Sequence, residues 1–145
     1  MALPSSETLH ATSVAIGDRA VLIEGPSGAG KSDLALRLID RGAVLVSDDY
    51  TVLARDGDVL IASAPDTIAG QIEVRGIGIV PIAHRDGVRV ALAIRLTDSP
   101  ERMPPSDEKR SIAGVAIPEV AIDARSASAP IKVELAIEHL AGAEV

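Results

Sequence analysis

The sequence predicts an α/β fold with a mixed β-sheet and few helices, and three observations support this. Residues 25–32, Gly-Pro-Ser-Gly-Ala-Gly-Lys-Ser, match the phosphate-binding loop pattern Gly-x-x-x-x-Gly-Lys-[Ser/Thr] at every fixed position. An apolar run at 20–23 precedes the loop, and apolar residues at helical spacing follow it at 34, 35, 38 and 39. Farther along, short apolar runs separated by turn residues predict that the middle of the chain is mostly strand.

The first elements are a hairpin and a strand on either side of the loop helix. Residues 9–16 alternate loosely and reach the turn pair Gly17-Asp18 before the strand that enters the loop. After the helix, residues 43–46 form a short apolar strand, which we expect to pair in parallel with the loop strand. We expect residues 1–8 to be a flexible N-terminus and residues 9–145 to form one domain.

The middle and end of the chain contain hairpins, a loop and a second helix. Hairpins are predicted around 56–58 and 75–76, and a further strand over 88–96. The charged, proline-rich stretch 98–111 is interpreted as a long surface loop. Ser128 is placed to cap a helix that begins at Ala129-Pro130. The expected apolar side of that helix consists of Ile131, Leu135, Ile137 and Leu140.

Composition narrows the class of protein. The chain has 145 residues, 47% of them apolar, and Tyr50 is its one aromatic residue, so the core must be built from aliphatic side chains. No apolar run approaches the roughly 18 residues of a membrane span, and no signal-peptide core is present, which favours the cytoplasm. Zero cysteines exclude disulfides and thiolate metal sites. A net charge of −7 argues against nucleic-acid or anionic-membrane partners.

The glycine loop is the predicted nucleotide-binding element. Its glycines allow backbone N–H groups to close around an anion at a helix N-terminus. Lys31 is expected to reach the outer phosphates, and Ser32 supplies a hydroxyl for Mg²⁺. The predicted binding residues are Gly25, Pro26, Ser27, Gly28, Ala29, Gly30, Lys31 and Ser32.

Asp48 and Asp49 are the best candidates for chemistry. They end the strand that follows the loop helix, and ligands in open α/β sheets gather at the carboxyl ends of strands. A Walker-B-type carboxylate that serves Mg²⁺ would explain one of them, and a general base for a hydroxyl nucleophile would explain the other. A solvated turn at a strand end is the simpler alternative.

Four further residues have weaker signals. Glu73 and Arg75 share one face of a strand, where a carboxylate could complete a Mg²⁺ shell, although a solvated ion pair is the commoner arrangement. His10 opens a strand, where a histidine is more often a surface residue than a catalyst. Arg125 is a candidate phosphate contact or an ordinary surface arginine.

These segments, in this order, resemble the catalytic domain of HPr kinase/phosphorylase. The resemblance runs from about His10 through residues 25–32, 41–49 and 64–65 to residues 72–80, Ile-Glu-Val-Arg-Gly-Ile-Gly-Ile-Val, which look like the family's signature segment. It implies a fold similar to the nucleotide-binding domain of phosphoenolpyruvate carboxykinase, and commonly a hexameric assembly. Because the match begins near residue 10, we expect a compact form similar to those of alpha-proteobacteria.

The resemblance also implies roles for residues. Asp48, the first aspartate, would be the acid/base, Ser32 and Glu73 would hold Mg²⁺, and Asp49 and His10 would belong to the surrounding network. Arg125 would match an arginine near a C-terminal phosphate site, in a region that diverges from the family pattern. The predicted catalytic residues are Asp48, Asp49, His10, Lys31 and Arg125.

The expected function is therefore that of a Mg²⁺–ATP-dependent protein-serine kinase acting on HPr, with phosphorolysis of the product by inorganic phosphate as a second activity. Two alternatives stay open. One is a small-molecule kinase with a basic lid of Arg102, Lys109 and Arg110. The other is a nucleotide sensor without catalysis.

Overall fold

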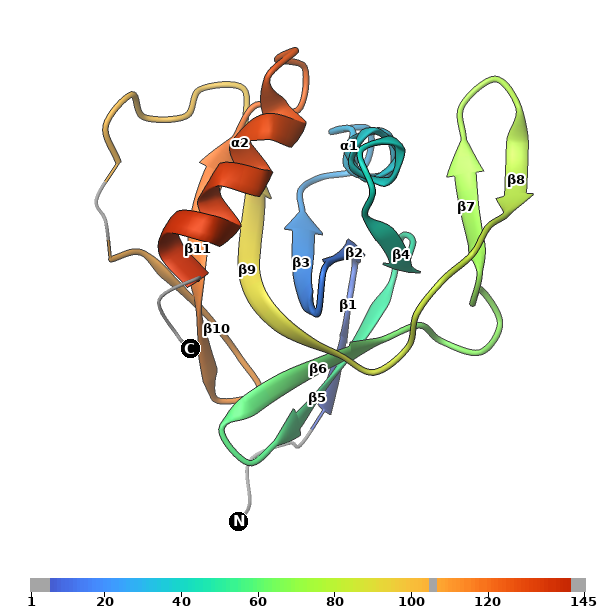
Figure 1. Ribbon diagram of the computed structural model, residues 1–145, viewed down its shortest axis with the longest axis horizontal. Coiled ribbons are helices and arrows are strands. Elements are labelled where there is room, and N and C mark those ends of the chain that lie inside the picture. Colours follow the sequence, from blue (N-terminus) through green and yellow to red (C-terminus); the bar gives the residue numbers. More distant parts are fainter. Residues whose placement is uncertain (1–5, 105–106, 142–145) are drawn as a thin grey trace.

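The computed structural model describes residues 6–104 and 107–141, and its central element is one curved nine-stranded sheet. Strands β2 (Ala11–Ile16) and β3 (Arg19–Glu24) form the predicted antiparallel hairpin. Gly17 sits in its turn with φ +63°, a left-handed conformation that favours glycine. β3 lies between β2 and the parallel strand β9 (Val88–Leu96), at the centre of the sheet (Figure 1).

The strand that follows the loop helix, β4 (Val44–Ser47), pairs antiparallel with β2. The expected parallel pairing of residues 43–46 with the loop strand is therefore wrong. The tight turn after β2 folds the chain back on itself, so β2 occupies the edge of β3 that β4 would otherwise have used. As a result, residues at the start of β2 lie beside the carboxyl end of β4.

The predicted hairpin around residues 56–58 is confirmed as β5 (Thr51–Asp56) and β6 (Val59–Ser63). Its outer neighbour is β1 (Ser6–Leu9), so the flexible N-terminus expected over residues 1–8 is wrong for residues 6–8. The side chain of Glu7 also accepts a hydrogen bond of 2.7 Å from the N–H of Ala113, which anchors β1 to a distant turn. Residues 1–5 of that expected segment lie outside the described residues.

The stretch expected to be a loop over residues 98–111 ends in a strand. Residues 109–111 belong to β10 (Lys109–Ile112), which pairs with β11 (Val115–Ile122), and β11 pairs in parallel with β9. The prediction failed there because β10 depends on distant partners, among them the two-pronged ion pair between Arg110 and Glu24. Residues 105 and 106 lie outside the described part.

Aliphatic clusters cover both faces of the sheet, as the composition predicts. Helices α1 (Lys31–Asp40) and α2 (Ala129–Ala136), followed by a π-helical turn at Ile137–Ala141, cover one face. Successive residues of β3 alternate between the two clusters, with Ile23 on the helical side and Leu22 on the other. None of the helices in the described ranges has the length and apolarity needed to cross a bilayer.

The apolar side expected for the second helix is partly wrong. Ile131 and Leu135 are 43% and 58% exposed, whereas Val133 and Ile137 are buried. Arg41, which follows α1, and Glu134 of α2 form an ion pair with a shortest distance of 2.8 Å, and this contact fits the observed rotation of α2.

Strands β7 (Gln71–Val74) and β8 (Gly78–Pro81) form the second predicted hairpin as a separate two-stranded sheet. The hairpin stands to one side of the main sheet, beyond α1 and β4 (Figure 1). Ile72 anchors it in the cluster on the helical face. The hairpin therefore forms a wall next to the carboxyl end of β4.

Candidate active site

The glycine loop connects the end of β3 to the start of α1, as the motif predicts. A Cβ atom on Gly25 would lie 3.0 Å from the Cβ of Leu96, so the loop can leave the sheet there only without a side chain. Gly30 precedes α1 with φ +99° and lies close to Ala124. These two glycines set the path of the loop.

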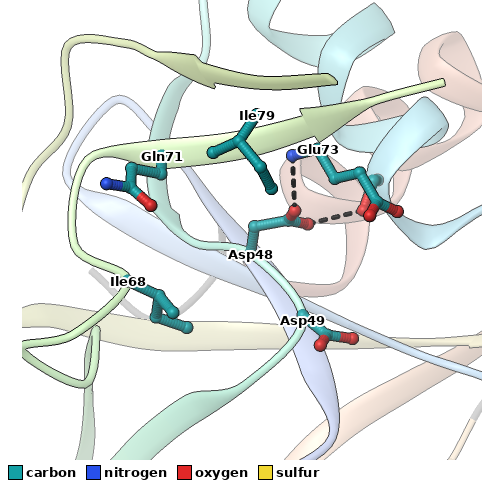
Figure 2. Close-up of a pocket in the computed structure, with 7 residues that line it drawn as sticks. Asp48, Asp49, Ile68, Gln71, Glu73 and Ile79 are labelled. Atoms are coloured by element: carbon teal, nitrogen blue, oxygen red, sulfur yellow. Dashed lines mark hydrogen bonds between the residues drawn. The ribbon is translucent and has the colours of Figure 1, made fainter. Parts of the chain in front are cut away.

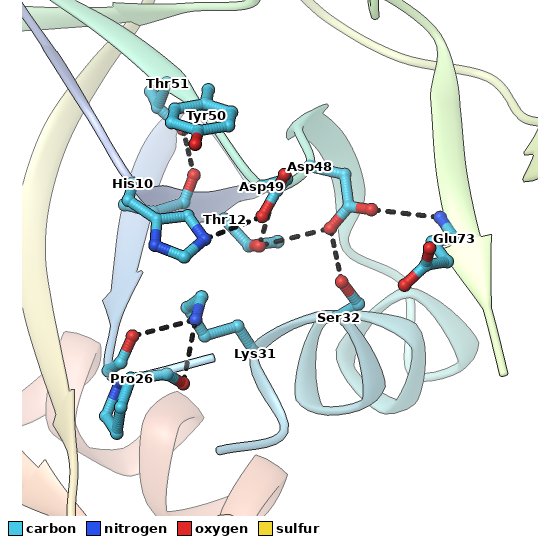
Figure 3. Close-up of polar contacts among 12 residues, drawn as sticks. His10, Thr12, Pro26, Lys31, Ser32, Asp48, Asp49, Tyr50, Thr51 and Glu73 are labelled. Carbon is cyan, nitrogen blue, oxygen red and sulfur yellow. Dashed lines mark hydrogen bonds and ion pairs between the residues drawn. The ribbon is translucent and has the colours of Figure 1, made fainter. Parts of the chain in front are cut away.

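Lys31 is buried at the first position of α1. Its ammonium donates hydrogen bonds of 2.8 Å to the carbonyl oxygen of Gly25 and 3.1 Å to that of Pro26 (Figure 3). The charge is therefore held against the loop itself, beside the helix N-terminus where an anion is stabilised.

Asp48 is the hub of the site and is only 6% exposed. Its Oδ1 accepts hydrogen bonds from the hydroxyls of Ser32, at 2.6 Å, and Thr12, at 3.1 Å. Its Oδ2 accepts one of 2.9 Å from the backbone N–H of Glu73. One carboxylate thus connects the loop helix, β2 and β7 (Figure 3).

Asp49 has a different environment, because its side chain is 58% exposed. Its backbone is left-handed, with φ +69°, which is uncommon for a residue other than glycine and occurs more often at functional sites. His10 Nε2 donates a hydrogen bond of 2.8 Å to Asp49 Oδ1, since a carboxylate can only accept. The His10 ring stacks on Tyr50 with centroids 5.1 Å apart.

A pocket of about 170 Å³ lies between the aspartates and the β7–β8 hairpin (Figure 2). Hydroxyl and carboxylate oxygens in its lining are the donors that Mg²⁺ prefers. Within the described ranges, no three His, Cys, Asp or Glu side chains gather closely enough to form a metal cage. The residues therefore fit a cation that keeps water and phosphate oxygens among its ligands. The pocket is lined by Ser32, Asp48, Asp49, Ile68, Gln71, Glu73 and Ile79.

Arg125 lies on the loop between β11 and α2 and pairs with Asp123, with a shortest ion-pair distance of 3.0 Å. Hydrogen bonds from Arg125 lower the pKa of Asp123 below its ordinary value of 3.8. The neighbouring Ala124 approaches Gly30, so this loop is adjacent to the end of the phosphate loop. Arg37 of α1 connects the two by donating to the carbonyl oxygens of Ala124 and Ser126.

The structure brings His10 together with Asp49, and Ser32 and the Glu73 backbone together with Asp48. Lys31 lies against the phosphate loop, whereas Arg125 pairs with Asp123 on the loop before α2. Sequence reasoning missed Thr12 and Arg37. A signal for Thr12 existed, since His10 and Thr12 are two residues apart and extended chain places such residues on one face. No comparable pattern marked Arg37.

The strand, glycine loop and helix, with a carboxylate bonded to the loop serine, define the class of the protein as a phosphate-loop nucleotide-binding domain. A family model described as the HPr Serine kinase C-terminal domain matches residues 1–141. The chain belongs to that family, and the resemblance and fold class expected from the sequence are confirmed.

Individual relatives agree with this assignment. An HPr kinase/phosphorylase of Alkaliphilus metalliredigens is 41% identical over 133 residues, covering 83% of this chain and 43% of the relative. One from Azoarcus sp. is 38% identical over 129 residues, covering 79% and 41%. The chain thus spans less than half the length of these curated relatives. The solved structure of the Hpr(Ser) kinase/phosphatase from Coxiella burnetii is similar with a TM-score of 0.78 and 33% identity, covering 91% of this chain and 94% of that one.

Proposed function

We propose that this chain is the catalytic domain of a Mg²⁺–ATP-dependent kinase that phosphorylates a serine of HPr. The observation that carries the proposal is the bond between Ser32 and Asp48, because it places the aspartate pair directly against the phosphate loop. The names of the relatives support the acceptor. We further propose that the same site removes the phosphate by phosphorolysis.

In this proposal the N–H groups of residues 25–32 bind the ATP phosphates, and Lys31 moves from the loop carbonyls to neutralise them. Ser32, Glu73 and Asp48 are the residues that would hold Mg²⁺. When bound, the ion neutralises phosphate charge as a Lewis acid. Arg125 follows Ala124, which lies close to Gly30, and on release from Asp123 it would supply a second positive charge.

The family resemblance implied that Asp48 is the acid/base. The geometry favours Asp49 for that role. Both oxygens of Asp48 already accept hydrogen bonds, and one donor is the loop serine, which suits a carboxylate on the metal side. Asp49 is exposed and oriented by His10 through one oxygen. We therefore assign removal of the proton from the acceptor hydroxyl to Asp49.

The proton can then be followed in both directions. In the kinase direction the serine hydroxyl loses its proton to Asp49 as its oxygen bonds to the γ-phosphorus and ADP leaves. In phosphorolysis Asp49 accepts the proton of the attacking hydroxyl of inorganic phosphate as that oxygen bonds to the phosphorus of phosphoserine, and passes it to the serine oxygen as that oxygen leaves. Atom balance makes pyrophosphate the second product of that reaction.

The test is transfer of labelled γ-phosphate from ATP to purified HPr, with Mg²⁺ varied, by the wild type, Asp49→Asn, Asp48→Asn and Lys31→Ala. We expect Asp49→Asn to lower kcat by about 10²- to 10⁴-fold with nucleotide affinity retained. Asp48→Asn should also raise the Mg²⁺ requirement, and Lys31→Ala should weaken nucleotide binding. Absence of transfer by the wild type would overturn the function, and an Asp49→Asn enzyme of normal kcat would overturn the assignment of the base.

The two alternatives predict other outcomes. A small-molecule kinase would need Arg102, Lys109 and Arg110 free to close over its substrate. Arg110 is instead held by Glu24 through two hydrogen bonds of 2.9 and 3.0 Å, which disfavours the small-molecule kinase. A nucleotide sensor would bind ATP without turnover on any acceptor. We also propose that the protein assembles as a homo-oligomer, with six copies by family resemblance. It would act in the cytoplasm, without nucleic-acid or membrane partners. Light scattering in solution tests the assembly.

A further inference from the structure

The β7–β8 hairpin has two faces with different environments. Ile72 pairs with Val80 on one face, and this face packs against the aliphatic cluster beneath the helices. Glu73 pairs with Ile79 on the other face, and both line the pocket of the aspartates (Figure 2). Ile79 is nevertheless 62% exposed, and Ile77 in the adjoining turn is 78% exposed. The core therefore does not account for these two isoleucines.

The size of the pocket determines what can enter it. At about 170 Å³ it admits a single side chain, whereas the folded body of a protein has to stay outside it. A protein that delivers a hydroxyl to Asp49 must therefore rest its neighbouring residues on the rim. Ile79 forms an apolar part of that rim and is continuous with the pocket lining.

We propose that Ile79, extended by Ile77, is the docking surface for the segment of the acceptor protein that carries the phosphorylated serine, and that this segment places an aliphatic side chain beside the serine. The inference rests on the proposed kinase function and deepens it. Exposed aliphatic residues at the mouth of a polar site gain free energy when a partner covers them, and such patches mark interaction sites. The acceptor is thus selected by apolar contact on the hairpin and by its hydroxyl in the pocket.

If Ile79 acts in docking, its substitution should change the KM for HPr without changing kcat. Ile79 lies on β8, and its side chain carries no group that binds phosphate or a metal ion, so its truncation should change the KM for HPr more than nucleotide binding or the chemical step. Ile79→Ala should raise the KM for HPr by about tenfold, which corresponds to about 1.4 kcal/mol, with little change in kcat. Ile79→Asp should raise KM further, because the acceptor's aliphatic side chain would then meet a charge.

The experiment measures KM and kcat for HPr, and the Kd of Mg²⁺–ATP, in the wild type, Ile79→Ala, Ile79→Asp and the control Ile131→Ala. Ile131 is an exposed isoleucine on α2, and its truncation should leave all three constants unchanged. A raised KM with unchanged kcat and Kd, at an unchanged melting temperature, supports docking. An unchanged KM in Ile79→Asp, or an equal rise in the Kd of Mg²⁺–ATP, overturns the inference but leaves the kinase in place. No transfer by the wild type overturns both.

Discussion

Ser32 donates a hydrogen bond of 2.6 Å to Oδ1 of Asp48, and this bond joins the first turn of α1 to the end of β4. The two residues come from motifs 16 positions apart. Because Asp48 also accepts from Thr12 and from the Glu73 backbone, a shift of the loop helix moves the carboxylate relative to β2 and β7. The phosphate loop and Asp48 therefore form one hydrogen-bonded unit, in which the position of one depends on the position of the other.

Removal of the Ser32 hydroxyl tests this unit. We expect Ser32→Ala to raise the Mg²⁺ concentration for half-maximal phosphate transfer by roughly 10- to 100-fold, since both a proposed metal ligand and the hydrogen bond that orients Asp48 are lost. Ser32→Thr keeps the hydroxyl and should behave nearly as the wild type. A Mg²⁺ titration of transfer checks both, and equal Mg²⁺ curves for Ser32→Ala and Ser32→Thr would contradict the prediction.

Arg37 is predicted to hold the loop of Arg125 against α1. Arg37→Ala removes the donors to the carbonyls of Ala124 and Ser126, and should lower the free energy of unfolding by about 1.5–3 kcal/mol. Arg37→Lys should recover only part of this loss, because an ammonium lacks the planar fork of a guanidinium. Urea unfolding measures both variants. Full recovery by lysine would show that charge alone matters.

Gly70 is predicted to tolerate a side chain less well than a matched glycine, for two reasons. It has φ +72°, and a Cβ there would lie 2.8 Å from Nδ1 of His84. Gly57 is a matched control, with φ +62° and open space around it, so Gly57→Ala should cost only about 1–2 kcal/mol of stability for the left-handed backbone. Gly70→Ala should cost at least about 1 kcal/mol more, by crowding. Equal melting temperatures for the two variants would contradict this account.

The Asp123–Arg125 pair should be visible in a titration. Arg125 lowers the pKa of Asp123, so the pair stabilises the fold above the ordinary pKa of 3.8, and this contribution is lost as the pH falls through the lowered value. Arg125→Ala should raise the pKa of Asp123 towards 3.8, as followed by carboxyl NMR. The control Arg55→Ala, on β5, should leave that titration unchanged. A pKa that does not move in Arg125→Ala would show that the pair is not formed in solution.

Much of the fold was predictable from local patterns. The glycine loop, the helix after it and the hairpins at residues 56–58 and 75–76 each depend on neighbours in sequence, so the chain alone predicts them. β10 and β11 were missed because their strand conformation depends on pairing with each other and with β9, and their sequence lacks clean alternation. The exposed position of Ile131 could not be foreseen either, since helical spacing does not say which side faces the sheet.

By itself the sequence determined the phosphate loop, the paired aspartates and the family, because each is encoded by contiguous residues whose chemistry requires fixed spacing. Only the tertiary structure decided which side chains surround each aspartate. The antiparallel pairing of β2 with β4 brings Thr12 to Asp48 and His10 to Asp49 across 36 and 39 positions of chain. Strand pairing over such distances depends on which strand edge is still unpaired. Here β2 already occupies the edge of β3, so β4 pairs with β2 instead.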